Sequence, residues 1–278
     1  MNLQQYRPSG FRVLPPVVKN LLIINALFFL ATIAFQKVYN IDLADYLGLH
    51  YFGAEKFSPY QFITYMFMHG NFTHILFNMF ALWMFGNVLE NYWGPKRFLI
   101  YFIVTGIGAA LIHYIVFYIE ISPVLTAIND FLNDPSNEKI HAFINSPNMK
   151  IGSYEIQNHF NEFVRDYNSV ISQNPERAIQ IAVNYMTQYR IDFLNAPVVI
   201  GASGAVFGIL LAFGMMFPNA MLYIFFAIPM KAKYFVIIYG AIELFSGFYD
   251  TTSNVAHFAH LGGMIFGYFL IIYWKKHK

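Results

Sequence analysis

A serine and a histidine in two glycine-rich apolar runs are the first candidates for chemistry. Ser203 lies in GASGAVFG (201–208), and His260 lies in NVAHFAHLGGMIFG (254–267). A hydroxyl becomes a useful nucleophile when a neighbouring imidazole takes its proton, so this pair could support acyl transfer. A lone serine in an apolar helix usually bonds to its own backbone instead. The pair is therefore a site only if the fold brings the two side chains together.

A second polar pair lies in the run HGNFTHILFN. His74 and Asn78 are separated by four positions, which places both on one face of a helix. Their side chains can donate hydrogen bonds to the oxyanion of a tetrahedral intermediate, the task of preorganised donors in acyl transfer. Alternatively, Asn78 could simply join two helices by a hydrogen bond. We favour the oxyanion role because three runs place polar groups near their starts.

Other kinds of chemistry find little support in the sequence. The absence of Cys excludes disulfides, thiolate nucleophiles and thiolate zinc sites. His69 and His257 could be taken for metal ligands, but no His-Glu-x-x-His motif occurs, and we expect no metal and no cofactor. No Asp lies within an apolar run, which argues against an aspartyl dyad. We expect Glu243 and Glu90 to be helix-packing or interfacial groups.

The composition is that of a membrane protein. Only 12% of the 278 residues are charged, against about 25% in soluble domains. The hydrophobic share is 57%, above the usual ~45–50%. A formal net charge of +2 with so few charges gives no broad basic face, so we expect a lipid bilayer and no nucleic acid as partner.

Apolar runs near the ~20 residues needed to cross a bilayer predict an all-α, polytopic bundle of six transmembrane helices. The runs cover about 18–36, 73–92, 98–119, 198–217, 232–249 and 254–274. The apolar stretch 221–228 is too short to cross and lies between Pro218 and Pro229. We interpret that stretch as interfacial.

The distribution of Lys and Arg sets the orientation. With the N-terminus inside, the inner segments carry Arg7, Arg12, Lys19, Lys96, Arg97, Lys231, Lys233, Lys275, Lys276 and Lys278. The short outer loops carry only Lys37 and Lys56. Segments 1–17 and 275–278 are therefore predicted to be cytoplasmic. We expect a multi-pass protein of the bacterial cytoplasmic membrane, with both termini inside.

Small residues accompany the serine and the histidine. They are Gly201, Gly204 and Gly208 in the fourth run, and Gly263 and Gly267 in the sixth. Such spacing lets two helices approach closely. Ser203 and His260 each lie about six residues past the start of a run that enters from outside, which places both roughly 8–9 Å below the outer surface. Close packing at equal depth would bring them together.

Residues 120–196 interrupt the core segments 18–119 and 197–274. This stretch holds nine of the 15 acidic residues and no spanning run, so we predict a helical insertion on the outer side. Asn174-Pro175 is typical of a helix start, with an N-cap followed by Pro at the first helical position. The insertion is either a helical cap, packed on itself or on the membrane surface, or a docking site for a partner or substrate.

Taken together, these motifs resemble those of the rhomboid family of intramembrane serine proteases. The similarity covers the block 59–86 with His-x-x-x-Asn at His74/Asn78, Gly-x-Ser-Gly at Gly201–Gly204, and Ala-His-x-x-Gly-x-x-x-Gly at Ala259–Gly267. Two features depart from the family pattern: the Trp-Arg pair common in the first outer loop is absent, and the 120–196 insertion is unusually long.

The resemblance implies Ser203 as nucleophile and His260 as base, in a dyad without a carboxylate. It also implies that His74, Asn78 and the Ser203 amide surround the oxyanion, and that His257 is not the catalytic histidine. The expected activity is endopeptidase cleavage of transmembrane protein substrates near the outer ends of their helices. The fifth run and the loop 246–253 are the expected moving parts.

Two other functions compete with this reading. A catalytically inactive rhomboid-like protein would bind membrane clients, but retention of both Ser203 and His260 argues against it. A transporter would show paired interrupted spans and intramembrane charges, which are not evident here.

Overall fold

The computed structural model describes residues 12–224, 227–249 and 254–277. The chain divides into two compact units. The core unit comprises Met1–Leu43, Phe62–His113 and Ile200–Lys278, and the insertion unit comprises Ala44–Gln61 and Tyr114–Val199. The predicted segments 1–17, 246–253 and 275–278 lie partly outside the described residues.

The fold is the predicted all-α polytopic membrane fold, and 76% of the described residues are helical. Four helical stretches in the described chain are long and apolar enough to cross a membrane: Pro16–Tyr39 (α1), Phe72–Trp93, Pro95–Asn133 (α6) and His257–Lys276 within α12 (Asn254–Lys276). Large apolar side chains such as Leu27 and Phe269 are exposed on these helices, as expected for surfaces that contact lipid.

The predicted fourth and fifth spans are also helices, but among the described residues neither is counted as long and apolar enough to cross a membrane. Helix α10 (Ser203–Met216) has 14 residues, which is about 21 Å of helix against a hydrocarbon core of about 30 Å. Helix α11 covers Ala232–Tyr249. The run 198–217 overestimated α10 because its first residues, Val198–Val199, form a short strand (β2).

The apolar stretch after α10 forms a hairpin. Strand β3 (Met221–Ile224) pairs antiparallel with β4 (Ile228–Lys231), and Met221 lies opposite Lys231. The prolines on either side of this stretch explain why no helix continues through it, since Pro cannot donate the hydrogen bond that a helix interior needs.

The second span is a composite helix. Helix α4 (Phe72–Ala81) continues through a π-helical turn, η2 (Leu82–Gly86), into α5 (Asn87–Trp93). Near its C-terminal end Glu90 is buried and accepts hydrogen bonds from the Val17 and Val18 amides, at 2.9 and 2.8 Å. Those amides belong to the first turn of α1, where backbone N–H groups have no partners within the helix. Glu90 is thus the helix-packing group that we expected.

The insertion unit is built from helices. Helix α6 runs unbroken past residue 120 to Asn133, so the predicted start of the insertion falls inside a helix. It is followed by α7 (Asn137–Ile144), α8 (Tyr154–Val170) and α9 (Pro175–Asn195). The Asn174 side chain accepts from the Arg177 amide, which confirms the predicted cap.

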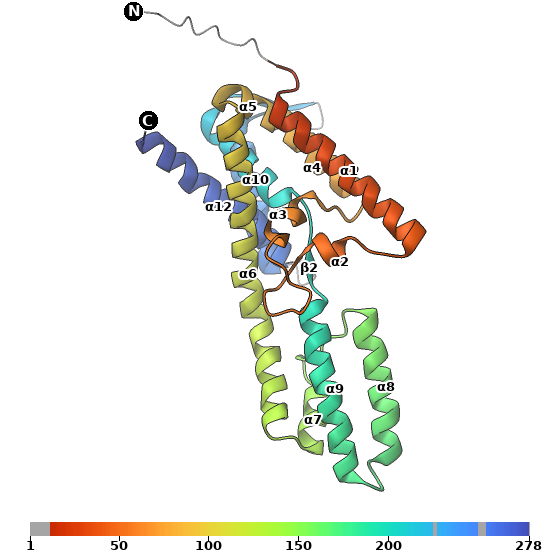
Figure 1. The fold of residues 1–278 in the computed structure, drawn as a ribbon. Helices are drawn as coiled ribbons and strands as arrows, with labels where there is room; N and C mark the ends of the chain where they lie inside the picture. The colour runs from red at the N-terminus through yellow and green to blue at the C-terminus, as the bar shows by residue number, and fades with distance from the viewer. Residues whose placement is uncertain (1–11, 225–226, 250–253, 278) are drawn as a thin grey trace, which may run out of the picture. The chain divides into compact units, whose positions relative to one another are not determined.

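Apolar side chains from these four helices form one buried cluster around Ile128, Ile140, Phe163 and Met186. Helices α8 and α9 lie side by side and antiparallel (Figure 1). Burial of this cluster explains why a stretch rich in charged residues folds as a compact body.

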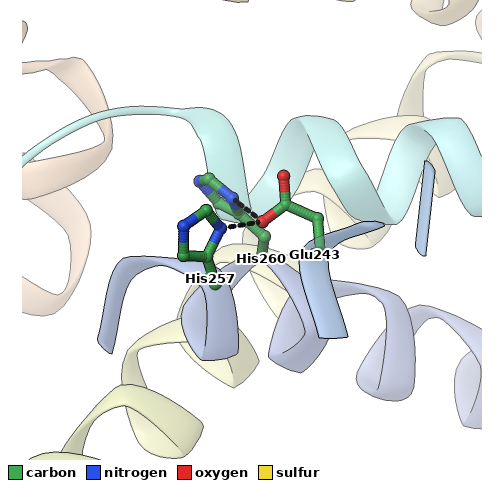
Figure 2. Close-up of side chains that lie close together, drawn as sticks. All are labelled: Glu243, His257 and His260. Carbon is green, nitrogen blue, oxygen red and sulfur yellow. Dashed lines mark hydrogen bonds and ion pairs between the residues drawn. The ribbon is translucent and has the colours of Figure 1, made fainter. Parts of the chain in front are cut away.

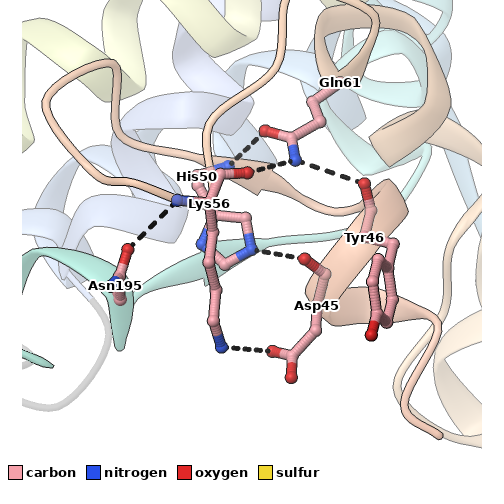
Figure 3. Close-up of polar contacts among 6 residues, drawn as sticks. All are labelled: Asp45, Tyr46, His50, Lys56, Gln61 and Asn195. Atoms are coloured by element: carbon pink, nitrogen blue, oxygen red, sulfur yellow. Dashed lines mark hydrogen bonds and ion pairs between the residues drawn. The ribbon is translucent and has the colours of Figure 1, made fainter.

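The first loop belongs to the same unit. It contains α2 (Ala44–Leu47) and β1 (Leu49–His50), which pairs antiparallel with β2. Gln61 is fully buried, and its amide nitrogen donates to the Tyr46 and Lys56 carbonyls while its oxygen accepts from the His50 amide (Figure 3). The same oxygen also accepts from the Ser58 amide. All four hydrogen-bonding positions of the side chain are satisfied, so it fixes the loop.

A second set of contacts closes the loop. Lys56 forms an ion pair with Asp45 at 3.4 Å, and the Lys56 amide donates to the Asn195 side chain at 3.2 Å. After the loop, α3 (Gln61–Thr64) and the 3₁₀ turn η1 (Tyr65–Phe67) lead into α4.

Candidate active site

Ser203 and His260 meet in the core unit. The His260 Nε2 atom lies 2.8 Å from the Ser203 Oγ atom, which is hydrogen-bonding distance. The ring of Phe207 stacks on the His260 imidazole with centroids 4.3 Å apart and an interplanar angle of 4°. Sequence reasoning did not identify Phe207. It follows Ser203 by four residues, so it lies on the same face of α10.

The positions of the two residues within their helices are not both the ones that we expected. His260 is the seventh residue of α12, as predicted, but Ser203 is the first residue of α10 rather than about six residues into it. The equal-offset argument was therefore wrong. The backbone before Ser203 is not helical, and this leaves the serine at a helix N-terminus, where amide groups have no partners within the helix.

Gly201 makes this local structure possible. Its φ angle is +121°, a conformation that strains other residues, and its amide donates to the Tyr65 carbonyl at 2.9 Å. A Cβ atom here would lie 2.7 Å from the His74 Nε2 atom. The glycine thus lets the His74 ring pack against the backbone just before Ser203.

The His74 ring is oriented by its surroundings. Its Nδ1 atom faces the Gly70 amide at 3.5 Å, a long hydrogen bond in which Nδ1 accepts. A neutral ring that accepts at Nδ1 carries its proton on Nε2, so Nε2 is a donor beside Gly201. The Asn71 side chain caps α4 by accepting from the His74 amide at 2.8 Å.

His69 lies behind this ring. The centroids of His69 and His74 are 5.0 Å apart, and the two rings meet edge to face. Burial, and secondarily the nearby His74, lower the pKa of His69 to about 4. The buried ring is therefore neutral at pH 7.

Asn78 is buried one turn further along α4. Its amide nitrogen donates to the His74 carbonyl at 2.9 Å. An Asn amide has two N–H groups, so this bond leaves one donor free to serve a bound group. This bond lies within α4 and joins no second helix.

Ser203, His260, His74 and Asn78 all border one cavity of about 680 Å³. The cavity lies among α4, η2, α10, α11 and α12, and most of its walls are apolar, with Phe77, Phe80, Met84, Leu210 and Phe235 among them. An apolar cavity with a few polar groups at one place is typical of a binding site for an apolar ligand that must be oriented.

The predicted glycines lie at two different helix contacts, one between α10 and α12 and one with α6. A Cβ atom on Gly263 would lie 1.8 Å from the Gly204 carbonyl oxygen, which is the expected close approach of α10 and α12. The other positions face α6: a Cβ on Gly204 would meet Ala109, and one on Gly208 would meet Thr105. The prediction that all four glycines lie between the fourth and sixth helices was therefore wrong in part.

Gly267 also faces α6. A Cβ atom there would lie 2.1 Å from the Tyr101 hydroxyl. Tyr101 itself donates from that hydroxyl to the Gly208 carbonyl at 2.8 Å. Helix α6 is thus the common support against which α10 and α12 are held.

Glu243 is a member of the site that we did not predict. Its Oε2 atom lies 2.9 Å from His260 Nδ1 and 2.7 Å from His257 Nδ1, and the carboxylate is buried (Figure 2). We expected Glu243 to be a helix-packing or interfacial group, and the resemblance implied a dyad without a carboxylate. The structure places this carboxylate within hydrogen-bonding distance of His260. The available signal was a charged residue within a membrane helix, which is costly and usually functional.

The same three side chains form a cluster that could hold a metal ion, the one such cluster in the described residues. Their ligand atoms lie within 4.8 Å of one another. The separations of 2.7 and 2.9 Å between Nδ1 and Oε2 are those of hydrogen bonds with a proton between the atoms.

The comparisons with known proteins place these features in a family. The sequence model of the Rhomboid domain matches residues 56–119 and 178–277, which together are more than half of the chain. The match skips residues 120–177 and contains Ser203, His260, His74, Asn78 and Glu243. A comparison with curated proteins found no match. The chain is a member of the rhomboid family.

Proposed function

We propose that this protein is an intramembrane serine endopeptidase that cleaves transmembrane proteins near the outer ends of their helices. The observation that supports the proposal most strongly is the 2.8 Å contact between Ser203 Oγ and His260 Nε2 at the border of an apolar cavity. A rhomboid fold alone is also compatible with client binding, whereas a serine with a hydrogen-bonded base indicates acyl transfer.

Acylation uses these two groups directly. His260 Nε2 takes the hydroxyl proton as Ser203 Oγ attacks the substrate carbonyl carbon, and a tetrahedral intermediate forms. The C–N bond then breaks, and His260 returns the proton to the leaving amine. The products are a free amine fragment and an ester on Ser203, which water hydrolyses with His260 again as the base.

The oxyanion has three donors within reach in this proposal. They are the Ser203 amide at the start of α10, His74 Nε2–H and the free N–H of Asn78. The positive end of the α10 dipole adds to their effect. Donors that are already in place stabilise the intermediate without reorganising, and each one is worth about 10²–10³ in rate.

The apolar walls of the cavity suit a segment of a transmembrane helix. A helical peptide bond is shielded by its own hydrogen bonds, so the substrate must unwind locally. We therefore expect small side chains and helix-breaking residues at the cleavage site. Hydrolysis of the ester needs water at Ser203. With the N-terminus on the inner side of the membrane, Ser203 lies near the outer side, so the water enters from there.

The test is cleavage of a model transmembrane substrate by the purified protein in detergent or liposomes. The wild type should release two fragments, while Ser203→Ala should bind the substrate and release none. Substrate binding without cleavage by the wild type would favour the alternative, an inactive client-binding member of the family.

A further inference from the structure

We propose that Glu243 is a positioning residue that converts the serine–histidine pair into a Ser203–His260–Glu243 triad. The inference rests on the proposed function and extends it. The three residues come from three helices, α10, α12 and α11, and form a continuous chain of hydrogen bonds of 2.8 Å and 2.9 Å. Figure 2 shows both histidine rings directed at one carboxylate oxygen of Glu243.

The first step of the argument concerns the tautomer of His260. A carboxylate oxygen only accepts hydrogen bonds, so the contact at Nδ1 requires a proton on that nitrogen. A neutral imidazole protonated at Nδ1 has its lone pair on Nε2, the atom that faces Ser203 Oγ. Glu243 therefore selects the one neutral tautomer that can act as base. Without it, nothing among the described contacts of Nδ1 distinguishes the two tautomers.

The second step concerns charge during the reaction. When His260 takes the serine proton, an imidazolium forms in a site that is largely shielded from water. The adjacent carboxylate stabilises this cation, and the gain is larger in an apolar environment than in water. Phe207 stacks on the ring but carries no charge. The electrostatic part of the stabilisation thus comes from Glu243.

The third step explains why a carboxylate is tolerated here. Burying an ionised group within a membrane bundle is costly unless it is hydrogen-bonded. Glu243 is 7% exposed, and its Oε2 atom accepts from His257 as well as from His260. The two histidines are three positions apart on α12, so they share a face. His257 thereby holds the carboxylate in place, a role distinct from that of His260.

The position of Glu243 also links the base to the wall of the cavity. Helix α11 supplies Phe235 and Tyr239 to the cavity, and Tyr239 stacks on Phe207 with centroids 5.3 Å apart. Glu243 lies one turn beyond Tyr239 on the same face. The orientation of His260 therefore depends on how α11 packs against α12.

The test compares Glu243→Gln, Glu243→Asp and His257→Ala with the wild type on one transmembrane substrate. Glu243→Gln should lower kcat by about 10²–10⁴-fold with little change in KM, up to the ~10⁴-fold loss that follows replacement of a triad aspartate by asparagine. Glu243→Asp should recover part of the loss. His257→Ala should stay within about tenfold of wild type, because it supports only the carboxylate. Val236→Ala, a buried position on α11, is the control for helix packing.

A second readout separates the triad from a structural role. Nitrogen-15 spectra of histidine-labelled protein should show His260 protonated at Nδ1 in the wild type and as a mixture of tautomers in Glu243→Gln, with His260→Ala assigning the signals. This measurement does not depend on protease activity, so it stays informative if the wild type cleaves nothing, a result that would instead contradict the proposed function.

Two results would overturn the triad. One is Glu243→Gln with wild-type kcat and an unchanged tautomer of His260. The other is a stoichiometric metal ion in the purified wild type that is lost in both Glu243→Gln and His257→Ala, which would assign the cluster to metal binding.

Discussion

The imidazole of His260 is constrained on three sides, by Ser203 at Nε2, by Glu243 at Nδ1 and by Phe207 on one face. Each contact restricts the orientation of the ring before the proposed reaction begins. A base that is already oriented needs no rearrangement to take the serine proton, and this is the main benefit of preorganisation in acyl transfer.

At the residue scale, replacement of the oxyanion donors should slow cleavage without preventing it. Asn78→Ala and His74→Ala should each lower kcat by about 10²–10³-fold and leave KM almost unchanged, since the donors act on the oxyanion and not on the bound substrate. Steady-state kinetics with a fluorogenic transmembrane peptide would measure both constants.

The matched control is Thr73→Val, because Thr73 borders the same cavity but has no assigned role. Its rate should stay within about threefold of wild type. Unchanged kinetics of Asn78→Ala on several substrates would mean that its hydrogen bond to the His74 carbonyl is its whole function.

Residue types and local spacing identified four residues that the structure brings to one cavity. His74 and Asn78 are four apart, and Ser203 and His260 lie in recognisable glycine patterns, so these four residues could be found along the chain. Glu243 has no fixed spacing to any of them. It reaches His260 only because α11 packs beside α12, which is a tertiary contact that local sequence does not encode.

At the scale of elements, the geometry depends on how closely α12 approaches α10. Backbone from the two helices meets where Gly263 faces the Gly204 carbonyl, and α6 supports both from the side of Ala109 and Thr105. A few added atoms at this contact would separate the helices that carry Ser203 and His260.

Gly263→Ala should therefore lower stability and activity together. Its methyl group would lie 1.8 Å from the Gly204 oxygen, which forces the helices apart at a cost of about 1–3 kcal/mol. Thermal unfolding in detergent and cleavage rate should both fall.

Gly240→Ala on α11 is the control for this change. The added Cβ atom would be in ordinary contact with Met264, at 3.5 Å from its nearest atom. It should leave both properties close to wild type. Gly263→Ala with unaltered melting temperature and rate would contradict the close-packing argument.

Hydrophobic runs predicted the existence and the order of the helices, but they did not predict where each helix begins. The run 198–217 includes strand β2 and Gly201 with its positive φ angle, so α10 is shorter than the run. Apolar residues suit a buried strand and a buried helix equally well. The runs therefore could not show that Ser203 stands at a helix N-terminus.

At the scale of the whole molecule, the distribution of Lys and Arg gives a testable orientation. The chain has no native Cys, so a single Cys reports its own location. Ser172→Cys, in the exposed turn after α8, should react with a membrane-impermeant maleimide in intact cells. Lys276→Cys should react only after the inner side is opened. The reverse pattern would overturn the orientation and with it the outer location of the cleavage site.

The insertion should modulate the reaction without performing it. Replacing residues 123–195 with a short flexible linker removes the whole apolar cluster of α6–α9, so we expect cleavage of a small model substrate to stay within about threefold of wild type while cleavage of large clients changes. Excision of 137–171 alone would expose Ile128 and Met186 and should cause aggregation.

Loss of the folded core in the complete excision would show a different role. The insertion would then brace the core helices, and the effect would appear as a missing thermal transition rather than as altered kinetics.

The central claim is that Ser203 becomes acylated or phosphonylated with the help of His260. The most direct measurement is mass spectrometry of the protein after treatment with a mechanism-based phosphonate. The wild type should carry one adduct on the peptide that contains Ser203, while Ser203→Ala and His260→Ala should carry none. In the cleavage assay, the variant with both substitutions should be no less active than either single variant, because the two residues act as a unit. An adduct on another residue, or substrate cleavage by Ser203→Ala at an appreciable fraction of the wild-type rate, would contradict it.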